Sequence, residues 1–312
     1  MSEFDWFDGL DVLGNLPPEK AAAKLREFGE EDAADAVENA QGELDGSLGV
    51  FESVKDWWPF RDRAWQHTAH AFGYLPPVAS SGRKALPIRH AGNIKADRGL
   101  RDARLKVTLD RLRVADYPGG GTHRVLFDFY AQNQVSCNVE HVHFNMTCRV
   151  RQSEHAAIVG YPVFVGLNVG EEGLALRCYT VNVRNEADEK FLSFLESDAF
   201  REGLKLATTM QPAIKPLSKM AVGLTRAIAS RHRNVPVQDF YMGLDFSQIP
   251  MRAHLAEGAY LAVQIPESLH AIWDWNEWMY DVSNGQVVGR QDSTRLIPYN
   301  YLVFSVSRCE GD

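Results

Sequence analysis

Two histidines spaced as His-x-His form the clearest candidate for metal chemistry in the sequence. His141 and His143 lie in a segment of alternating apolar and polar residues, so both imidazoles are expected on one face of a strand, within reach of one ion. Cys137 and Cys148 lie nearby, but the same alternation turns Cys148 to the opposite, apolar face. We expect no cofactor, and keep a metal-dependent enzyme using the two histidines as an alternative.

Three tryptophans in the run Trp-Asp-Trp-Asn-Glu-Trp form a candidate binding surface. Trp273, Trp275 and Trp278 could stack against a ligand or a protein partner, because indole rings offer large, rigid contact areas. The alternative interpretation is a loop or short helix that seals one end of the fold, since each ring has much apolar area to bury. Both interpretations stay open at this point.

Basic residues gather at the end of a predicted helix. Arg226, Arg231 and Arg233, with neighbouring lysines, could bind phosphate groups on a lipid, a nucleotide or RNA. A solvated helix end, favoured by the helix dipole, is the other interpretation. His67 and His70 lie three apart on a predicted helix spanning residues 61–72, where the spacing could chelate a metal.

Known catalytic motifs do not occur in the chain. The sequence has no Gly-x-Ser-x-Gly elbow, and the run Gly119-Gly120-Gly121 is not followed by the Gly-Lys-Ser/Thr of a phosphate loop. The four cysteines are not arranged as paired Cys-x-x-Cys elements, which favours a reducing compartment. We therefore predict no catalytic residue, and we expect the protein to lie in the cytoplasm.

A series of alternating segments must position these side chains. The clearest predicted strand is 141–150, in which one face, including Val142, Phe144 and Met146, is expected in the core and the histidine face in solvent. About eight such segments, separated by turn residues, predict a mainly β protein with some α: an antiparallel β-sandwich with a helical insertion at 188–233. A Pro- and Gly-containing stretch places a domain boundary between 1–93 and 94–312.

Acidic charge is concentrated at the N-terminus. The chain has a formal net charge of -8, but residues 1–50 hold 13 acids and 3 bases, whereas residues 51–312 hold 28 acids and 30 bases. Pro17 and Pro18 predict a helix start, Gly29 a helix stop, and 30–39 a second helix, so an acidic helical hairpin is expected. The overall acidity argues against general nucleic-acid binding.

The stretch from Leu105 to Tyr130 resembles the opening of the calcium- and lipid-binding β-sandwich domains. In both, a strand ends in an aspartate-bearing loop, here with Asp116, and the next strand returns as its sheet partner. The resemblance implies a sandwich fold. It does not extend to the clustered calcium aspartates, because no Asp-x-Asp pair appears in a later loop.

Together these features favour a non-enzymatic intracellular module. We expect it to recognise a protein or ligand through the sandwich loops and the tryptophan-rich end, with a protein partner or a second copy of the chain as the partner. The acidic hairpin could act as an intramolecular cover or as a docking arm for a basic partner. A lipid-surface or assembly component, with peripheral membrane contact and no transmembrane segment, is the further alternative.

Overall fold

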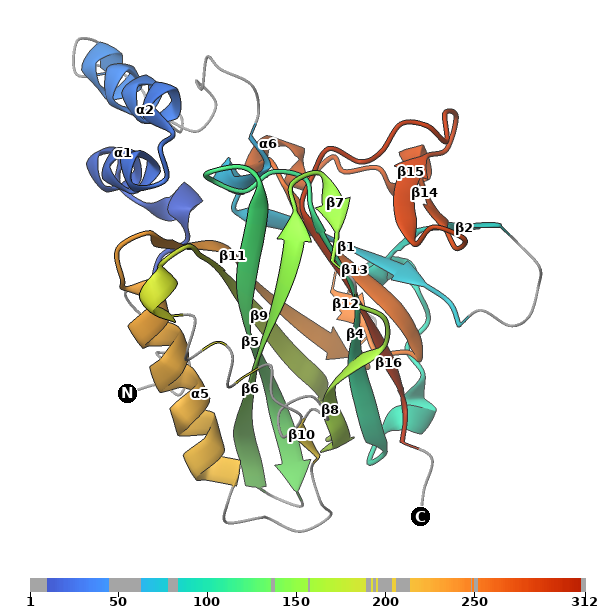
Figure 1. The fold of residues 1–312 in the computed structure, drawn as a ribbon. Helices are drawn as coiled ribbons and strands as arrows, with labels where there is room; N and C mark the ends of the chain where they lie inside the picture. Colours follow the sequence, from blue (N-terminus) through green and yellow to red (C-terminus); the bar gives the residue numbers. More distant parts are fainter. Residues whose placement is uncertain are drawn as a thin grey trace.

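A computed structural model describes residues 10–44, 63–77, 84–135, 138–156, 158–188, 192, 195, 204–205, 214–247, 249 and 252–309. The chain is mainly β, as predicted, with two large sheets packed face to face, a small third sheet and few helices (Figure 1). No helix within these ranges is long and apolar enough to cross a membrane.

The first sheet is antiparallel except at β10. In spatial order its strands are β10 (Leu204–Lys205), β8 (Tyr161–Asn168), β4 (Arg104–Val114), β16 (Tyr301–Arg308), β13 (Gly258–Ile265), β1 (Ala69–Leu75) and β3 (Arg89–His90), and β7 (Glu154–His155) also pairs with β4. Leu204, which the sequence placed in a helical insertion, therefore lies in a short strand parallel to β8.

The second sheet supplies the other layer of the sandwich. Its order is β12 (Ala253–His254), β11 (Asn234–Asp245), β9 (Gly173–Val183), β5 (Thr122–Val135) and β6 (Asn138–Arg151). A third sheet of β15 (Gln286–Gly289), β14 (Trp278–Asp281) and β2 (Ala85–Pro87) packs on the outer side of the first sheet. The short helices are α6 (Glu267–His270) and the 3-10 turns η2 (Leu13–Asn15), η4 (Ala64–Gln66), η5 (Ala91–Asn93), η6 (Arg98–Leu100), η7 (Glu186–Asp188) and η8 (Trp275–Glu277).

The period-two pattern of the long strands places their apolar face in the core. On β6, the predicted core residues Val142, Phe144 and Met146 are buried between the two large sheets, opposite the inward residues of β5 such as Phe127. The opposite face of β6 is expected in solvent; this is wrong for the middle of the strand, whereas Arg149 on the same face is exposed. His143 and Asn145 are buried there, because α5 (Ile214–Ala229) covers the outer face of the second sheet (Figure 1).

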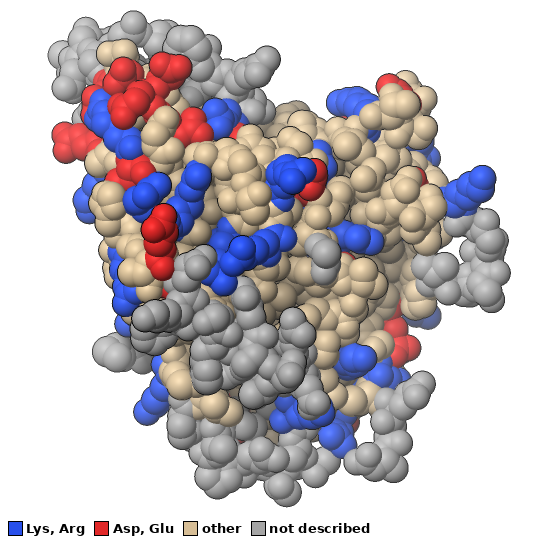
Figure 2. All heavy atoms as spheres, in the orientation of Figure 1, with Lys and Arg blue, Asp and Glu red and all other residues tan. Residues whose placement is uncertain are grey.

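The predicted acidic hairpin is present at the N-terminus. Helix α1 (Pro18–Glu27) begins at the proline pair and ends before Gly29, whose positive φ of 75° suits the tight turn into α2 (Glu31–Leu44). Leu25 and Phe28 join the main core cluster, which anchors the hairpin to the sandwich. Acidic side chains gather over the hairpin, with basic side chains beside it (Figure 2).

The helix predicted over residues 61–72 is wrong where the structure describes it. After the 3-10 turn η4, the chain enters β1 and pairs with β13 along seven residues. The sheet overrides the local pattern because Phe72 and Tyr74 pack well on a pleated surface. His67 precedes this strand and His70 lies within it, so the helical spacing proposed for metal binding does not exist. Trp57, Trp58 and Phe60 lie outside the described residues.

The structure describes part of the predicted insertion at 188–233, namely Asp188, Leu192, Leu195, β10, α5 and the turn that follows α5; residues 189–191, 193–194, 196–203 and 206–213 lie outside the described residues. The division between residues 93 and 94 stays a prediction. The main core cluster contains residues from both sides of it, among them Trp65, Tyr74, Leu105 and Val107.

Buried histidines make the stability of the fold depend on pH. Burial lowers the pKa of His70 to about 4, and burial together with the charges of Arg113 and Arg111 lowers the pKa of His155 to about 4. In the unfolded chain both groups return to roughly 6.5, so the native state binds fewer protons between these values. The free energy of unfolding should therefore fall as the pH falls from about 6.5 to about 4, by up to about 3 kcal/mol for the fully buried His70.

Urea unfolding at pH 7 and pH 4.5 measures this effect. The variant His70→Gln should lose part of the pH dependence, whereas His232→Gln, at a side chain 69% exposed, should keep it. An unchanged pH dependence in His70→Gln would show that this histidine does not contribute.

Candidate functional site

The two candidate metal ligands share one face of β6, as predicted, but His143 belongs to a buried hydrogen-bond network. Its Nδ1 lies 2.8 Å from Oδ1 of Asp128 on β5. Oδ2 of Asp128 accepts a hydrogen bond of 2.7 Å from the hydroxyl of Thr225 on α5. The backbone N–H of His143, on the outer edge of the sheet, donates to Oγ of Ser218 at 3.1 Å. This arrangement joins α5 to the second sheet through polar contacts.

His141 makes a separate contact on the same face. Its Nδ1 lies 2.5 Å from the hydroxyl of Tyr130, and the two rings are stacked with centroids 5.6 Å apart. Among the described residues no group of three or more His, Cys, Asp or Glu side chains is placed to hold a metal ion. Cys148 packs against the main core, on the face opposite the histidines, and Cys137 lies outside the described residues. A metal site at His141 and His143 stays a prediction.

The tryptophan-rich segment packs inside the protein. Trp275 and Trp278 are buried between the first and third sheets, and Trp273 stacks on Trp278 with ring centroids 6.3 Å apart. Gly73 permits this packing, because a Cβ there would lie 2.9 Å from the Trp275 ring. These rings fill a second core cluster, as in the sealing interpretation, and offer a partner little surface.

The three predicted anion-binding arginines lie around the C-terminal end of α5. Arg226 is exposed on the helix, whereas the guanidinium of Arg231 forms an ion pair with the fully buried carboxylate of Asp188. Arg233 adopts a positive φ of 60°, and its backbone N–H donates to Oε2 of Glu27 at 2.7 Å. The guanidinium of Arg231 and the backbone of Arg233 thus contribute to contacts of the turn after α5, whereas the Arg233 side chain is exposed.

The acidic hairpin docks on this same turn. Besides the contact of Glu27, the ammonium of Lys24 donates to the carbonyl of Arg231 at 3.3 Å. Oε1 of Glu30 accepts a hydrogen bond of 2.9 Å from the backbone N–H of Gly119, in the loop between β4 and β5. The side chain of Arg184 lies over the ring of Phe28, 6.0 Å from its centroid. The hairpin therefore covers one end of the second sheet.

Asp116, the aspartate of the calcium-type resemblance, is engaged by other side chains. Its carboxylate accepts hydrogen bonds from the guanidinium of Arg63, at 3.1 Å from Nη2, and from Nε2 of Gln152 at 2.9 Å. Burial raises its pKa, opposed by the charge of Arg63. The carboxylate oxygens that a calcium ion would need are used within the protein.

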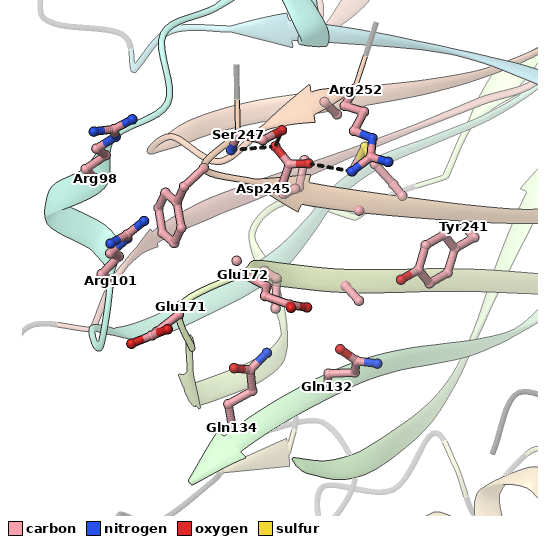
Figure 3. Close-up of a pocket in the computed structure, with 18 of the residues that line it drawn as sticks. Arg98, Arg101, Gln132, Gln134, Glu171, Glu172, Tyr241, Asp245, Ser247 and Arg252 are labelled. Atoms are coloured by element: carbon pink, nitrogen blue, oxygen red, sulfur yellow. Dashed lines mark hydrogen bonds and ion pairs between the residues drawn. The ribbon is translucent and has the colours of Figure 1, made fainter. Parts of the chain in front are cut away.

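A cavity lined by both polar and apolar side chains, which the sequence did not reveal, lies at the opposite end of the second sheet from the hairpin. Figure 3 shows it in close-up. It has a volume of about 860 Å³ and is bounded by η6, the end of β5, the turn between β8 and β9, and the end of β11. The end of β5 contributes Gln132 and Gln134, the β8–β9 turn contributes Glu171 and Glu172, and β11 contributes Tyr241, whose side chain is half exposed.

Two arginines form the cationic wall of this cavity. Arg98 is the first residue of the 3-10 turn η6, and Arg101 directly follows it. Residues three apart are eclipsed in such a turn, and both side chains lie along the same side of the cavity in Figure 3. The Arg101 guanidinium lies 5.4 Å from the centroid of the Phe246 ring. Within the described part of the chain, neither arginine forms an ion pair with a carboxylate. Both guanidinium groups are therefore available to an anion.

On the upper wall of the cavity, the negative charge of Asp245 is balanced by the positive charge of Arg252. Oδ1 of Asp245 accepts hydrogen bonds from the backbone N–H and hydroxyl of Ser247, at 3.0 and 2.7 Å, and Oδ2 lies 3.7 Å from Nη1 of Arg252. Asp245 and Arg252 thus offset each other's charge (Figure 3). The charge that remains at this end comes from the Arg98 and Arg101 pair and from Glu171 and Glu172.

A second cavity of about 760 Å³ adjoins the first and shares Arg98 and Phe246 with it. Lys95 and His254 line it as well. The Nδ1–H of His254 donates to the carbonyl of Ile94 at 2.6 Å, which fixes the orientation of the ring. Lys95, Arg98 and Arg101 therefore place three cations, at intervals of three residues, along the two adjoining cavities.

No sequence motif marks this site, because its described lining residues come from six segments of the chain that only the fold brings together. The spacing of Lys95, Arg98 and Arg101 is the one local signal, and it becomes informative only once a 3-10 turn is known at η6. The fold and site define a two-layer β protein with a cavity at one end. Comparison of the chain with protein-family models, curated proteins and solved structures gives no match.

Proposed function

We propose that this protein is a non-enzymatic intracellular binding module that holds a small anionic ligand in the cavity of Figure 3. The observation that supports it is the pair of guanidiniums, Arg98 and Arg101, aligned on one wall of a cavity of about 860 Å³. This volume lies in the range of roughly 300–1,000 Å³ found for small-molecule sites. Guanidinium pairs bind phosphate and carboxylate groups through charge-assisted hydrogen bonds.

The ligand then binds where β5 and β11 end and β9 begins, and not at the tryptophan-rich end predicted from the sequence. The tryptophans support a structural role, since Trp275 and Trp278 are buried in a core cluster. The metal-enzyme alternative gains no support, because among the described residues no third His, Cys, Asp or Glu is placed to complete a ligand set with His141 and His143. The lipid-surface alternative stays a prediction: the guanidinium of Arg231 forms an ion pair with Asp188, whereas the side chains of Arg226 and Arg233 are exposed.

Retention of small molecules by the purified protein tests the proposal. The protein is dialysed against the small-molecule fraction of a cell extract, and the retained compounds are identified by mass spectrometry. We expect anionic compounds to be retained by the wild type and at least about tenfold less by Arg98→Ala/Arg101→Ala, since each hydrogen bond to a charged group contributes about 1.5–3 kcal/mol.

The control variant loses the same charge elsewhere. Arg151→Ala/Arg290→Ala removes two exposed arginines that do not line the cavity, and it should retain the same compounds as the wild type. Equal retention by both double variants, or retention of no anion by the wild type, would contradict the proposal.

A further inference from the structure

The polar groups of the cavity change in character from one wall to the other. Figure 3 shows Arg98 and Arg101 on one side with Glu171 below them, Glu172 in the middle, and Tyr241 with Gln132 on the far side, below the Asp245–Arg252 ion pair. The cationic wall continues into the adjoining cavity, where Lys95 joins Arg98. A ligand that fits this order has several negative charges at one end, hydroxyl groups in the middle and a planar polar group at the other end.

Each region matches one part of a nucleotide. Guanidinium and ammonium groups bind phosphates, and a row of three cations suits more than one phosphate group. Carboxylates accept hydrogen bonds from ribose hydroxyls, as acidic residues do in dinucleotide sites. The Tyr241 ring, 49% exposed, offers a surface on which a base can stack, and side-chain amides such as that of Gln132 can donate to and accept from a base edge.

We propose that the ligand of this cavity is a nucleoside diphosphate. Its phosphates lie against Arg101, Arg98 and Lys95, its ribose lies near Glu172, and its base stacks on Tyr241. The inference rests on the proposed function, since it names the chemical class of the ligand bound at that site. The carboxylate of Glu172 would accept hydrogen bonds from ribose hydroxyls but would repel a further phosphate, which favours a nucleoside diphosphate over an inorganic polyphosphate.

Calorimetric titration of the full-length protein with ADP and with inorganic pyrophosphate tests the assignment. We expect ADP to bind at least about fivefold more tightly than pyrophosphate, because stacking contributes about 1–3 kcal/mol per base. The variant Tyr241→Ala should lose this advantage while binding pyrophosphate as the wild type does. Tyr241→Phe keeps the ring and should bind both compounds as the wild type does.

The outcomes separate this inference from the proposed function. ADP that binds no more tightly than pyrophosphate, or a Tyr241→Ala variant that weakens both compounds equally, overturns the nucleotide assignment. If the nucleotide assignment fails but the protein retains other anions from the extract, and this retention depends on Arg98 and Arg101, the proposed function still holds. Failure of both ADP and pyrophosphate to bind overturns the assignment as well, and the extract experiment then decides the proposed function.

Discussion

Replacing Asp128 by alanine should lower the free energy of unfolding by about 3–5 kcal/mol. The side chains of Asp128 and His143 are 0% and 1% exposed, so no water can replace the lost carboxylate. The substitution also removes the acceptor of the Thr225 hydroxyl and leaves buried polar groups without their partner. Guanidinium chloride unfolding measures the loss.

Asp239→Ala provides the matched control for this substitution. Asp239 forms an ion pair with Arg177 on the same face of the second sheet, with two contacts of 2.6 and 2.7 Å, but its side chain is 26% exposed. Solvent weakens such pairs, so we expect a loss of about 1 kcal/mol. Equal losses in the two variants would show that burial does not govern the strength of these contacts.

Trp275→Ala should cost about 3–5 kcal/mol of stability and leave ligand binding unchanged. The ring is 4% exposed and packs beside Trp273, with centroids 5.6 Å apart, in the cluster between the first and third sheets. Removing it leaves a large apolar void, because the surrounding sheets cannot collapse fully into the space. Chemical unfolding gives the stability loss, and dialysis against the cell extract gives the retained anions.

Two further variants complete this test. Ile272→Ala removes a side chain that is 72% exposed in the same segment, and its stability should change by less than about 0.5 kcal/mol. Trp275→Phe keeps most of the apolar volume, so it allows binding to be measured if the alanine variant does not fold. Loss of anion retention in folded Trp275→Phe would show that the tryptophan-rich end, and not the cavity, binds the ligand.

The local pattern was sufficient to predict each element whose period persists over many residues. The alternation of β6 gave the correct core face, and the proline pair and Gly29 gave the correct bounds of α1. In both cases the determinants lie close together in the chain: side-chain direction in a strand, and the conformational preferences of proline and glycine at helix ends.

Features that depend on distant segments could not be predicted. The histidine face of β6 is buried by α5, which lies about 75 residues further along the chain at the Ser218 contact. The strand β1 forms because its edges pair with β13 and β3. Aromatic residues near Trp65 are compatible with either a helix or a strand, so the local pattern could not decide between them.

The cavity could not be predicted from the sequence for the same reason, because its residues lie far apart in the chain. Arg98 and Arg101 look like ordinary surface residues in the sequence, and Tyr241 lies 140 positions after the second arginine. The antiparallel pairing of β9 with β5 and β11 places Tyr241 at one end of the second sheet, where η6 brings the two arginines. The tryptophans and the His-x-His pair are the more distinctive patterns in the sequence, but most of these side chains take part in internal packing and hydrogen bonding in the fold.

Arginine side-chain NMR tests the central claim most directly. The Nε–Hε signals of the ¹⁵N-arginine-labelled protein are assigned by single substitutions and followed during titration with inorganic pyrophosphate. We predict saturable shifts of the Arg98 and Arg101 signals, with the Arg290 signal unchanged, because only the first two line the cavity. Saturable shifts confined to other arginines, or no shift of Arg98 and Arg101 at millimolar pyrophosphate, would contradict the assignment of this cavity as an anion-binding site.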